Sequence, residues 1–322
     1  MLKSAKPLSS GVVRYLTHST YAMKEASNNK NQKVFTFDLK FAIKQYDSNY
    51  EQIKPLMTIT NDTSKYTESV IVFPGFEGRI AGVEPLIKNL KRTVHCMQYP
   101  FEKSKNNISE ITDSVLNVLQ SNGLLDKEKI NVLGHSYGGI IAVELIRRLE
   151  KEGKRIRLCL TDSSPYAMKM MTNRSFGDVH QIDEFEKKLI LNIANCVEFR
   201  DKNMLEELLK PYVHWQDKMN IAIPLISEKT NYNVDHLKTI ADSSHKVLQA
   251  IHYYNECDVR LNAETTLIRS SIQVLPFPND FKLAKICKQP VREFRTDGHH
   301  MNMLKFSRTA DLINEAFDGK VE

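Results

Sequence analysis

Hydrophobic and polar positions change their spacing near residue 68, and short apolar runs then alternate with stretches of helical periodicity. The apolar runs have the length of strands, whereas the stretches between them place apolar residues three or four positions apart. The expected strands are Ser69–Phe73, Thr93–Tyr99, the run Ile130–Leu133 and Arg157–Thr161, and the expected helices are Gly82–Leu90, Ile108–Leu119 and a helix from Ile140. This alternation predicts an α/β fold class with a mostly parallel sheet flanked by helices.

The alternation ends after Ala167, where about a hundred residues show helical periodicity only. The helices expected there are Asp183–Cys196, Asn203–Leu209 and Val234–Tyr254. Strand character returns at Thr265–Ile268 and near Pro290–Phe294. We therefore expect an α/β core of residues 68–166 and 264–322, with a helical lid of residues 167–263 inserted into it. A lid of this kind encloses an apolar ligand and excludes water, and the alternative is a second structural domain with no role in binding.

Residues 1–67 form a predicted N-terminal extension in which Ser, Asn, Gln and Lys are frequent, with one amphipathic stretch near Phe35–Ile43. No candidate for chemistry lies in it. The segment Met1–Lys24 carries basic residues and no acid, as transit peptides do. Arg14 interrupts its only apolar patch, which argues against a secretory signal, and we expect a cytoplasmic protein.

One short motif, Gly134-His135-Ser136-Tyr137-Gly138-Gly139, stands between the apolar run Ile130–Leu133 and the helix from Ile140. This is the strand-to-helix context of a nucleophile elbow, so Ser136 is the candidate nucleophile. A serine on so sharp a turn crowds the residues two positions before it and three after it, and the elbow needs small residues. We take Gly134 and Gly138 as the elbow glycines; the alternative is a plain turn serine.

A serine hydroxyl needs a histidine to take its proton and a carboxylate to orient that histidine. Asp162 ends an apolar run and precedes Ser163-Ser164-Pro165, so its side chain is expected at the sheet edge where Ser136 emerges. The alternative is a turn-capping aspartate. His299 and His300 follow the last expected strand, and the order serine, acid, histidine is that of α/β-hydrolases. Neighbouring histidines in a loop can point in opposite directions, so both remain open at this point.

The oxyanion of a tetrahedral intermediate needs backbone N–H donors. Tyr137, directly after the serine, supplies the first. The loop Pro74–Gly78 follows the first strand of the core, and its glycines allow the N–H of Phe76 to face the reaction centre. The alternative is an ordinary Gly-Pro turn.

Taken together, these residues resemble the thioesterase domain of animal-type fatty acid synthase, and they are also similar to thioesterases of polyketide and nonribosomal peptide synthetases. The resemblance runs from about Ser69 to Leu304, with a further similar pattern in Asp280–Cys287. Four blocks carry it in the same order: Val72-Phe73-Pro74-Gly75-Phe76-Glu77-Gly78, Gly134-His135-Ser136-Tyr137-Gly138-Gly139, Leu160-Thr161-Asp162-Ser163-Ser164-Pro165 and Gly298-His299-His300.

The resemblance implies an α/β-hydrolase fold in which Ser136 is the nucleophile, His300 the general base and acid, and Asp162 the orienting carboxylate. It implies Phe76 and Tyr137 as oxyanion donors, with no metal and no cofactor. His300 is selected because the family's catalytic histidine is the third residue of a Gly-x-His unit. His299 departs from the family, which often has an acid there, and the lid sequence is only weakly similar, so acyl-length preference does not transfer.

A second resemblance lies in the extension. The segment Ser10-Gly11-Val12-Val13-Arg14, followed by Thr20-Tyr21, is similar to the closing segment of the enoyl reductase domain in the same synthases. It implies that residues 1–67 are a remnant of such a domain, in a synthase fragment or a stand-alone enzyme.

The composition of the chain excludes several classes of protein. The chain has 322 residues, of which 41% are hydrophobic, enough for a full globular core. The net charge of +6 is spread among interspersed acids and bases without an aromatic-rich basic patch, which argues against nucleic-acid binding. No segment approaches the roughly 20 uninterrupted apolar residues of a membrane span. Five cysteines stand singly and fit a reducing compartment: Cys96, Cys159, Cys196, Cys257 and Cys287.

The expected function is hydrolysis of a long-chain fatty acyl thioester, carried by acyl carrier protein or coenzyme A, through an acyl-Ser136 intermediate. The mild basic excess suits the approach of an acidic carrier protein or an anionic thioester substrate, although solubility is the simpler explanation. The rivals are a carboxylesterase or lipase that cleaves oxygen esters and a non-catalytic remnant that binds acyl chains or a carrier. Seven residues are candidates to line an acyl tunnel, with ordinary core packing as the alternative: Met168, Met170, Met171, Phe185, Leu189, Ile190 and Ile193.

Overall fold

The computed structural model describes residues 39, 40, 43, 53–61, 68–99, 107–256, 260–273 and 275–318. These residues all belong to one compact unit, residues 36–322. The similarity to an enoyl reductase, in Ser10–Tyr21, lies outside the described residues, as does most of the stretch Phe35–Ile43.

A mostly parallel sheet of seven strands forms the centre of the described structure, with the order β1-β3-β2-β4-β5-β6-β7. Only β1 runs antiparallel to its neighbour in this sheet, β3. The strands are β1 (Leu56–Ile59), β2 (Val70–Phe73), β3 (Val94–Met97), β4 (Lys129–His135), β5 (Arg155–Thr161), β6 (Glu264–Ile272) and β7 (Arg292–His299). The predicted α/β fold class is confirmed, and each predicted strand is present with bounds shifted by a few residues.

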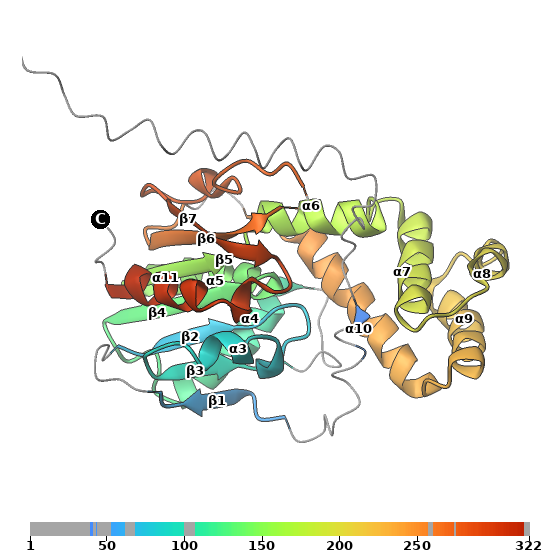
Figure 1. The fold of residues 1–322 in the computed structure, drawn as a ribbon, viewed down its shortest axis with the longest axis horizontal. Helices are drawn as coiled ribbons and strands as arrows, with labels where there is room; N and C mark the ends of the chain where they lie inside the picture. The colour runs from blue at the N-terminus through green and yellow to red at the C-terminus, as the bar shows by residue number, and fades with distance from the viewer. Residues whose placement is uncertain are drawn as a thin grey trace, which may run out of the picture. The chain divides into compact units, whose positions relative to one another are not determined.

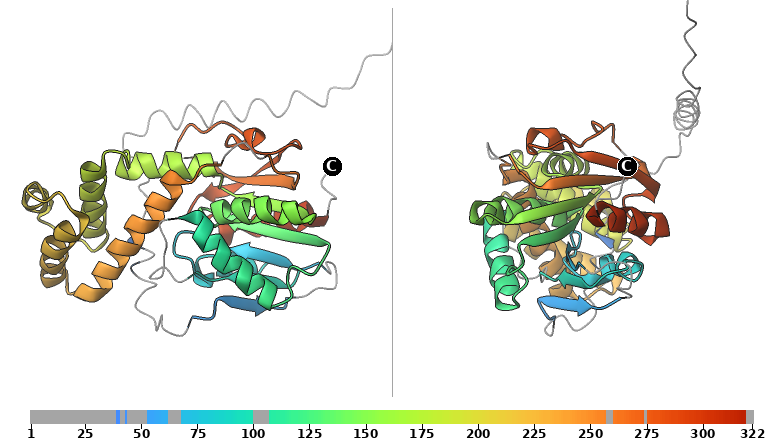
Figure 2. Two further views of the ribbon diagram at one scale, coloured as in Figure 1. Left: turned by 180° about the vertical axis from the view of Figure 1, so that it is seen from behind. Right: turned by 90° about the vertical axis from the view of Figure 1, so that its left-hand side faces the viewer.

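The sheet is covered by helices on both faces (Figure 2). Helices α4 (Ile108–Ser121) and α5 (Tyr137–Leu149) pack against one another on one face. Helices α3 (Glu84–Ile87) and α11 (Ser307–Asp318) share the other face, where their apolar residues join those of β2, β4 and β5 in the main hydrophobic cluster. Because the central strands are covered on both sides, β2 and most of β4 and β5 are buried along their length, as in other parallel sheets.

Strand register brings distant segments together at the carboxyl edge of the sheet. Phe73 pairs with Gly134, His135 pairs with Thr161, and Thr161 pairs with Ile268. The segments that follow β2, β4 and β5 therefore leave the sheet side by side, at the edge where α/β proteins bind ligands.

Five helices, α6 to α10, lie between β5 and β6 and form the predicted insertion. They are α6 (Pro165–Phe176), α7 (Ile182–Cys196), α8 (Lys202–Leu209), α9 (Trp215–Thr230) and α10 (Val234–Tyr253). In Figure 1, α6 and α10 connect the sheet with α7, α8 and α9. Three of the five, α7, α8 and α10, were predicted within one or two residues of their ends, whereas α6 and α9 were not predicted.

A buried ion pair holds three of these helices together. Lys218 of α9 is fully buried, and its Nζ lies 2.6 Å from Glu186 Oε2 and 2.8 Å from Asp183 Oδ1 on α7. His245 of α10 lies 3.1 Å from the other oxygen of Glu186. Loss of one partner would leave an uncompensated buried charge, so these contacts fix how α7, α9 and α10 pack.

Three further differences from the sequence prediction each concern a single element. The helix expected at Gly82–Leu90 is reduced to a 3-10 turn and the short α3, because the side-chain amide of Asn61 donates to the carbonyls of Ile87, at 2.8 Å, and Leu90, at 2.7 Å, and closes the helix there. Strand β1 lies within residues 1–67, so the sheet begins inside the segment predicted as an extension. Helix α11 was not predicted at all.

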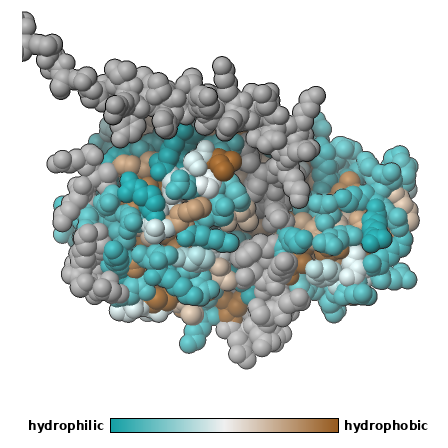
Figure 3. Space-filling model, in the orientation of Figure 1, coloured by the Kyte–Doolittle hydropathy of each residue, from teal (hydrophilic) through white to brown (hydrophobic). Residues whose placement is uncertain are grey.

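Hydrophilic residues predominate on the face shown in Figure 3, and hydrophobic residues occur there in small groups. Among the described residues, no helix has the length and apolar character needed to cross a membrane.

Candidate active site

Ser136 lies on a sharp turn between β4 and α5. Its backbone angles are φ 51° and ψ −126°, in a region that residues with a side chain seldom adopt. Non-glycine residues are held in such a conformation only where the surrounding structure enforces it, and they cluster at functional sites. The predicted strand-turn-helix context of the serine is present in the structure.

Three glycines make this turn sterically possible. A β-carbon at Gly134 would lie 2.6 Å from Gly139 Cα, and one at Gly138 would overlap the backbone carbonyl of Pro74. One at Gly139 would overlap the hydroxyl of Ser163. Gly134 and Gly138 thus occupy tightly packed positions beside Ser136, and Gly139 is a third position with the same restriction.

The structure brings Ser136, His300 and Asp162 together from three separate parts of the chain. His300 Nε2 lies 3.0 Å from Ser136 Oγ, and His300 Nδ1 lies 3.5 Å from Asp162 Oδ2. All three residues are less than a tenth exposed. With the carboxylate at Nδ1, the imidazole carries its proton there and leaves Nε2 free to accept the hydroxyl proton of Ser136.

The adjacent His299 is directed elsewhere. Its Nδ1 accepts a hydrogen bond from the backbone N–H of Met301, at 3.3 Å. Of the two neighbouring histidines, the structure therefore places His300 at the serine.

Asp162 is held by β6, the strand next to its own. The backbone N–H of Ser270 donates to Oδ1 at 2.8 Å, and the Ser270 hydroxyl donates to Oδ2 at 2.5 Å. Gln273 Nε2 donates to Oδ1 at 3.3 Å. Burial raises the pKa of Asp162, but the contact with His300 and the hydrogen bonds from Ser270 outweigh burial and hold the pKa below its usual value. Asp162 is therefore ionised at neutral pH.

Ser270 and Gln273 had no role in the sequence prediction. Their only sequence signal is that they follow the apolar residues of an expected strand, and that strand's place beside Asp162 is a property of the fold.

A second imidazole, that of His135, stacks on His300 with ring centroids 5.2 Å apart. His135 Nδ1 lies 3.2 Å from the carbonyl oxygen of Thr161, which can only accept, so Nδ1 carries the proton. Burial, followed by the effect of His300, lowers the pKa of His135 to about 3. The ring is therefore neutral at neutral pH and presents an uncharged face to His300.

The loop Pro74–Gly78 packs against the serine turn. The Tyr99 hydroxyl donates to the carbonyl of Pro74 and, at 3.1 Å, to that of Gly75. The rings of Phe76 and Tyr137 meet edge to face with centroids 6.4 Å apart, and both residues are buried. The two residues predicted as oxyanion donors thus lie on adjoining segments, one after β2 and one after β4.

Helix α6 contributes an apolar neighbour to the serine. Met168 Sδ lies 3.8 Å from Ser136 Oγ, and Met168 is fully buried. Of the seven residues proposed to line a tunnel, Met170 is exposed to 38% and points outward, whereas the other six are buried.

Glu77 is a buried carboxyl group in the same loop that sequence analysis left without a role. A β-carbon at Gly82 would overlap its Oε1, so the carboxyl is enclosed although the residue as a whole is only partly buried. Burial raises the pKa of Glu77 to about 7, against the opposing effects of hydrogen bonds from the backbone of Glu77 and Gly75 and of His300. Glu77 thus titrates near neutral pH, and its carboxyl accepts backbone hydrogen bonds within the loop that carries Phe76.

This pKa predicts a pH-dependent stability. A carboxyl whose pKa is higher in the folded state than in the unfolded chain contributes stability below the unfolded pKa of 4.5, and that stability is lost as pH rises through about 7. We expect wild type to lose up to about 3 kcal/mol more than Glu77→Gln between pH 5 and pH 8. Urea unfolding of both proteins at the two pH values measures this difference. Parallel losses in both proteins would show that Glu77 does not titrate in this range.

Comparison with known families agrees with this geometry. Residues 68–221 match the Thioesterase domain family. The chain is therefore similar to thioesterases over this segment, and its fold is that of the α/β-hydrolases. No curated protein matches the sequence.

Solved structures share the fold at low sequence identity. The chain is similar to the nonribosomal peptide synthetase AB3403, a four-domain protein bound to AMP and glycine, with 12% identity and a TM-score of 0.59. The match covers 83% of this chain and 20% of the synthetase, so the chain spans about a fifth of that protein.

Two smaller proteins are matched over nearly their whole length. One is the Vlm2 thioesterase domain bound with a dodecadepsipeptide, with 16% identity and a TM-score of 0.53; the match covers 81% of this chain and 97% of that one. The other is the type II thioesterase BorB from the borrelidin biosynthetic cluster, with 16% identity and a TM-score of 0.52; the match covers 82% of this chain and 96% of BorB. These likenesses establish the fold of the chain and do not single out animal fatty acid synthase.

Proposed function

We propose that this chain is a serine thioesterase that hydrolyses long-chain fatty acyl thioesters of acyl carrier protein or coenzyme A. Ser136 is the nucleophile, His300 the general base and acid, and Asp162 the carboxylate that orients His300. The observation that carries the proposal is the 3.0 Å contact between Ser136 Oγ and His300 Nε2, in a chain whose residues 68–221 match the Thioesterase domain family.

In the proposed reaction, His300 Nε2 takes the hydroxyl proton as Ser136 Oγ attacks the thioester carbonyl carbon. The N–H groups of Phe76 and Tyr137 stabilise the oxyanion of the tetrahedral intermediate. The carbon–sulfur bond then breaks, and His300 returns the proton to the thiol that leaves. Water, deprotonated by the same imidazole, then attacks the acyl carbon. The bond from that carbon to Ser136 Oγ breaks, His300 returns the proton to Oγ, and the fatty acid is released.

The fatty acyl substrate is supported by the apolar side chain of Met168 beside the serine and by the sequence resemblance to fatty acid synthase. We propose residues 167–263 as the lid over this site, since Met168 belongs to the first lid helix. We also propose that residues 1–67 derive from a synthase. We also propose a cytoplasmic location, which the single, unpaired spacing of the cysteines along the sequence supports.

Hydrolysis rates on matched esters test the substrate class. We expect kcat/KM for palmitoyl-coenzyme A to exceed that for p-nitrophenyl palmitate at least tenfold, because a lid that accepts a carrier-linked thioester contributes binding beyond the acyl chain. Equal or reversed values would indicate a carboxylesterase or lipase. Rates on a series of thioesters of increasing acyl length then define the preferred acyl length, with Ser136→Ala as the control for background hydrolysis. A preference for short acyl groups would contradict the long-chain assignment.

A further inference from the structure

Three potential metal ligands meet away from the serine, where the insertion joins the core. Asp178 and His180 lie in the connection between α6 and α7, and His252 lies in the last turn of α10. One ligand atom of each residue lies within 4.8 Å of the other two. None of the three takes part in the contacts around Ser136 described above.

The cluster is partly pre-arranged. The backbone N–H of His180 donates to Asp178 Oδ1 at 2.9 Å, which fixes the carboxylate beside the histidine. The two imidazole rings meet edge to face with centroids 4.7 Å apart, and His252 Nε2 lies 3.9 Å from Asp178 Oδ1. The ring of Tyr253 packs against both histidines.

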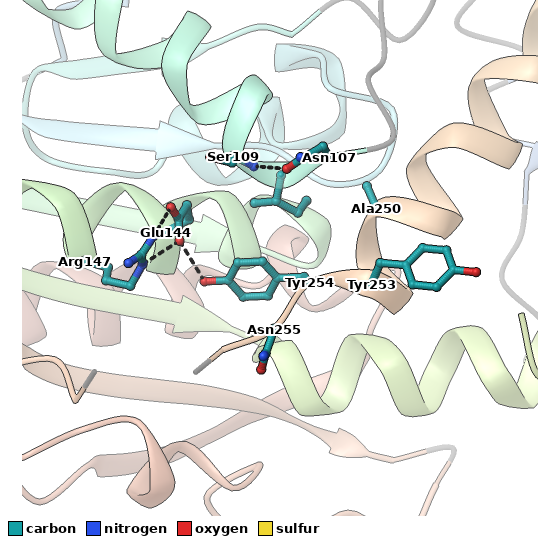
Figure 4. A pocket seen from close by; sticks show the side chains of 9 residues that line it. Asn107, Ser109, Glu144, Arg147, Ala250, Tyr253, Tyr254 and Asn255 are labelled. Carbon is teal, nitrogen blue, oxygen red and sulfur yellow. Dashed lines mark hydrogen bonds and ion pairs between the residues drawn. The ribbon is translucent and has the colours of Figure 1, made fainter. Parts of the chain in front are cut away.

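His252 is a fixed point in this cluster because the end of α10 is anchored to the core. The Tyr254 hydroxyl donates to Glu144 Oε2 on α5 at 3.2 Å. In Figure 4, Tyr254 points toward Glu144 in a pocket of about 270 Å³, whereas the ring of Tyr253, which also lines this pocket, points away from Glu144. Lys169 of α6 pairs with Glu256, just beyond α10, at 3.2 Å.

The state of His252 suits a metal ligand. Its Nδ1 is buried without a hydrogen-bond partner among the described residues, so protein atoms leave part of this ring unsatisfied. The imidazole of histidine is the commonest metal ligand in proteins.

We propose that Asp178, His180 and His252 bind one transition-metal ion of the zinc class, which ties the α6–α7 connection to the end of α10. Two imidazole nitrogens and one carboxylate oxygen are ligands that Zn²⁺ and Co²⁺ accept, and water completes a tetrahedral site. Bonds of about 2.0–2.1 Å place tetrahedral ligand atoms roughly 3.4 Å apart, so the cluster must contract by at most about 1.5 Å. Asp178 and His180 are exposed, so small side-chain rotations can bring their ligand atoms closer to His252.

Metal titration of the full chain, purified without an affinity tag and treated with a chelator, tests the site. We expect one Zn²⁺ per chain by calorimetry, a rise in Tm of a few degrees with excess Zn²⁺, and intense visible absorption with Co²⁺ as for a tetrahedral complex. His180→Ala and Asp178→Asn should each weaken Zn²⁺ binding at least tenfold. Both residues are exposed, so these variants are expected to fold.

The matched control is His214→Ala, which removes an exposed histidine at the start of α9 and should leave Zn²⁺ affinity unchanged. Failure of the wild type to bind Zn²⁺ at micromolar concentration would overturn the proposal. Equal affinity in wild type and His180→Ala would also overturn it, since the ion would then lie elsewhere. Zn²⁺ binding in this test does not depend on whether Ser136 is the nucleophile of a thioesterase.

Discussion

Replacing Ser136 with alanine is expected to lower kcat for palmitoyl-coenzyme A by about 10⁴- to 10⁶-fold. The variant retains His300, Asp162 and the loop of Phe76, but it has no oxygen 3.0 Å from His300 Nε2 to form an acyl-enzyme. The residual rate reflects binding and oxyanion stabilisation alone. Steady-state hydrolysis gives the loss of rate, and intact-mass analysis after treatment with a fluorophosphonate gives the loss of covalent labelling.

The comparison needs a serine that the proposal leaves without a role. Ser114 lies on an exposed surface of α4, and Ser114→Ala should keep both the hydrolysis rate and the labelling of wild type. Stoichiometric labelling of Ser136→Ala would place the nucleophile at another residue and refute the mechanism.

Asp162→Asn is expected to lower kcat by about 10³- to 10⁴-fold with little change in KM. An amide opposite His300 Nδ1 favours the tautomer with the proton on Nε2, which can no longer accept the proton of Ser136. Because contacts with His300 and Ser270 hold the pKa of Asp162 below its usual value, the wild-type carboxylate is ionised at every pH above about 5. The deficit of the variant should therefore persist from pH 6 to pH 9, as measured by pH–rate profiles of kcat/KM.

Gln273→Ala is the matched control for this substitution. It removes a single hydrogen bond of 3.3 Å to the same carboxylate and leaves the charge in place, so we expect less than a tenfold loss. A comparable loss in both variants would mean that the packing around Asp162, and not its charge, limits the reaction. An Asp162→Asn enzyme within tenfold of wild type would exclude the orienting role.

The sequence predicted the parts of the fold that have local signals. The buried runs of β2 and β4 are continuous and apolar, and the motif around Ser136 places its glycines within a few residues of the serine. Helix α9 was missed because Pro224 lies inside it and interrupts the helical pattern. Strand β1 was missed because it is an edge strand without a fully buried residue, so its sequence lacks the apolar run of a central strand. Helix α3 is shorter than predicted because its last carbonyls are bonded by Asn61, more than twenty positions earlier.

The contacts around the candidate site depended even more on tertiary structure. Ser270 reaches Asp162 only because β6 pairs with β5, and no residue spacing in the sequence predicts that pairing. His135 and Glu77 stood inside motifs that had been recognised, yet their burial, and with it the shift of each pKa, follows from packing against segments far away in the chain. The motifs located the residues of the candidate site, but they did not reveal the contacts that hold those residues in place.

One consequence follows from how the sheet carries these groups. Ser136, Asp162, Ser270 and His300 extend from the ends of β4, β5, β6 and β7, four consecutive strands of a single sheet, whereas α7 to α9 supply none of them. Chimeras that exchange α7–α9 for the corresponding helices of a related protein should therefore keep a working catalytic apparatus while acquiring a new acyl preference. Under the proposed roles, the residues that react and the helices that select the substrate can therefore evolve independently of one another.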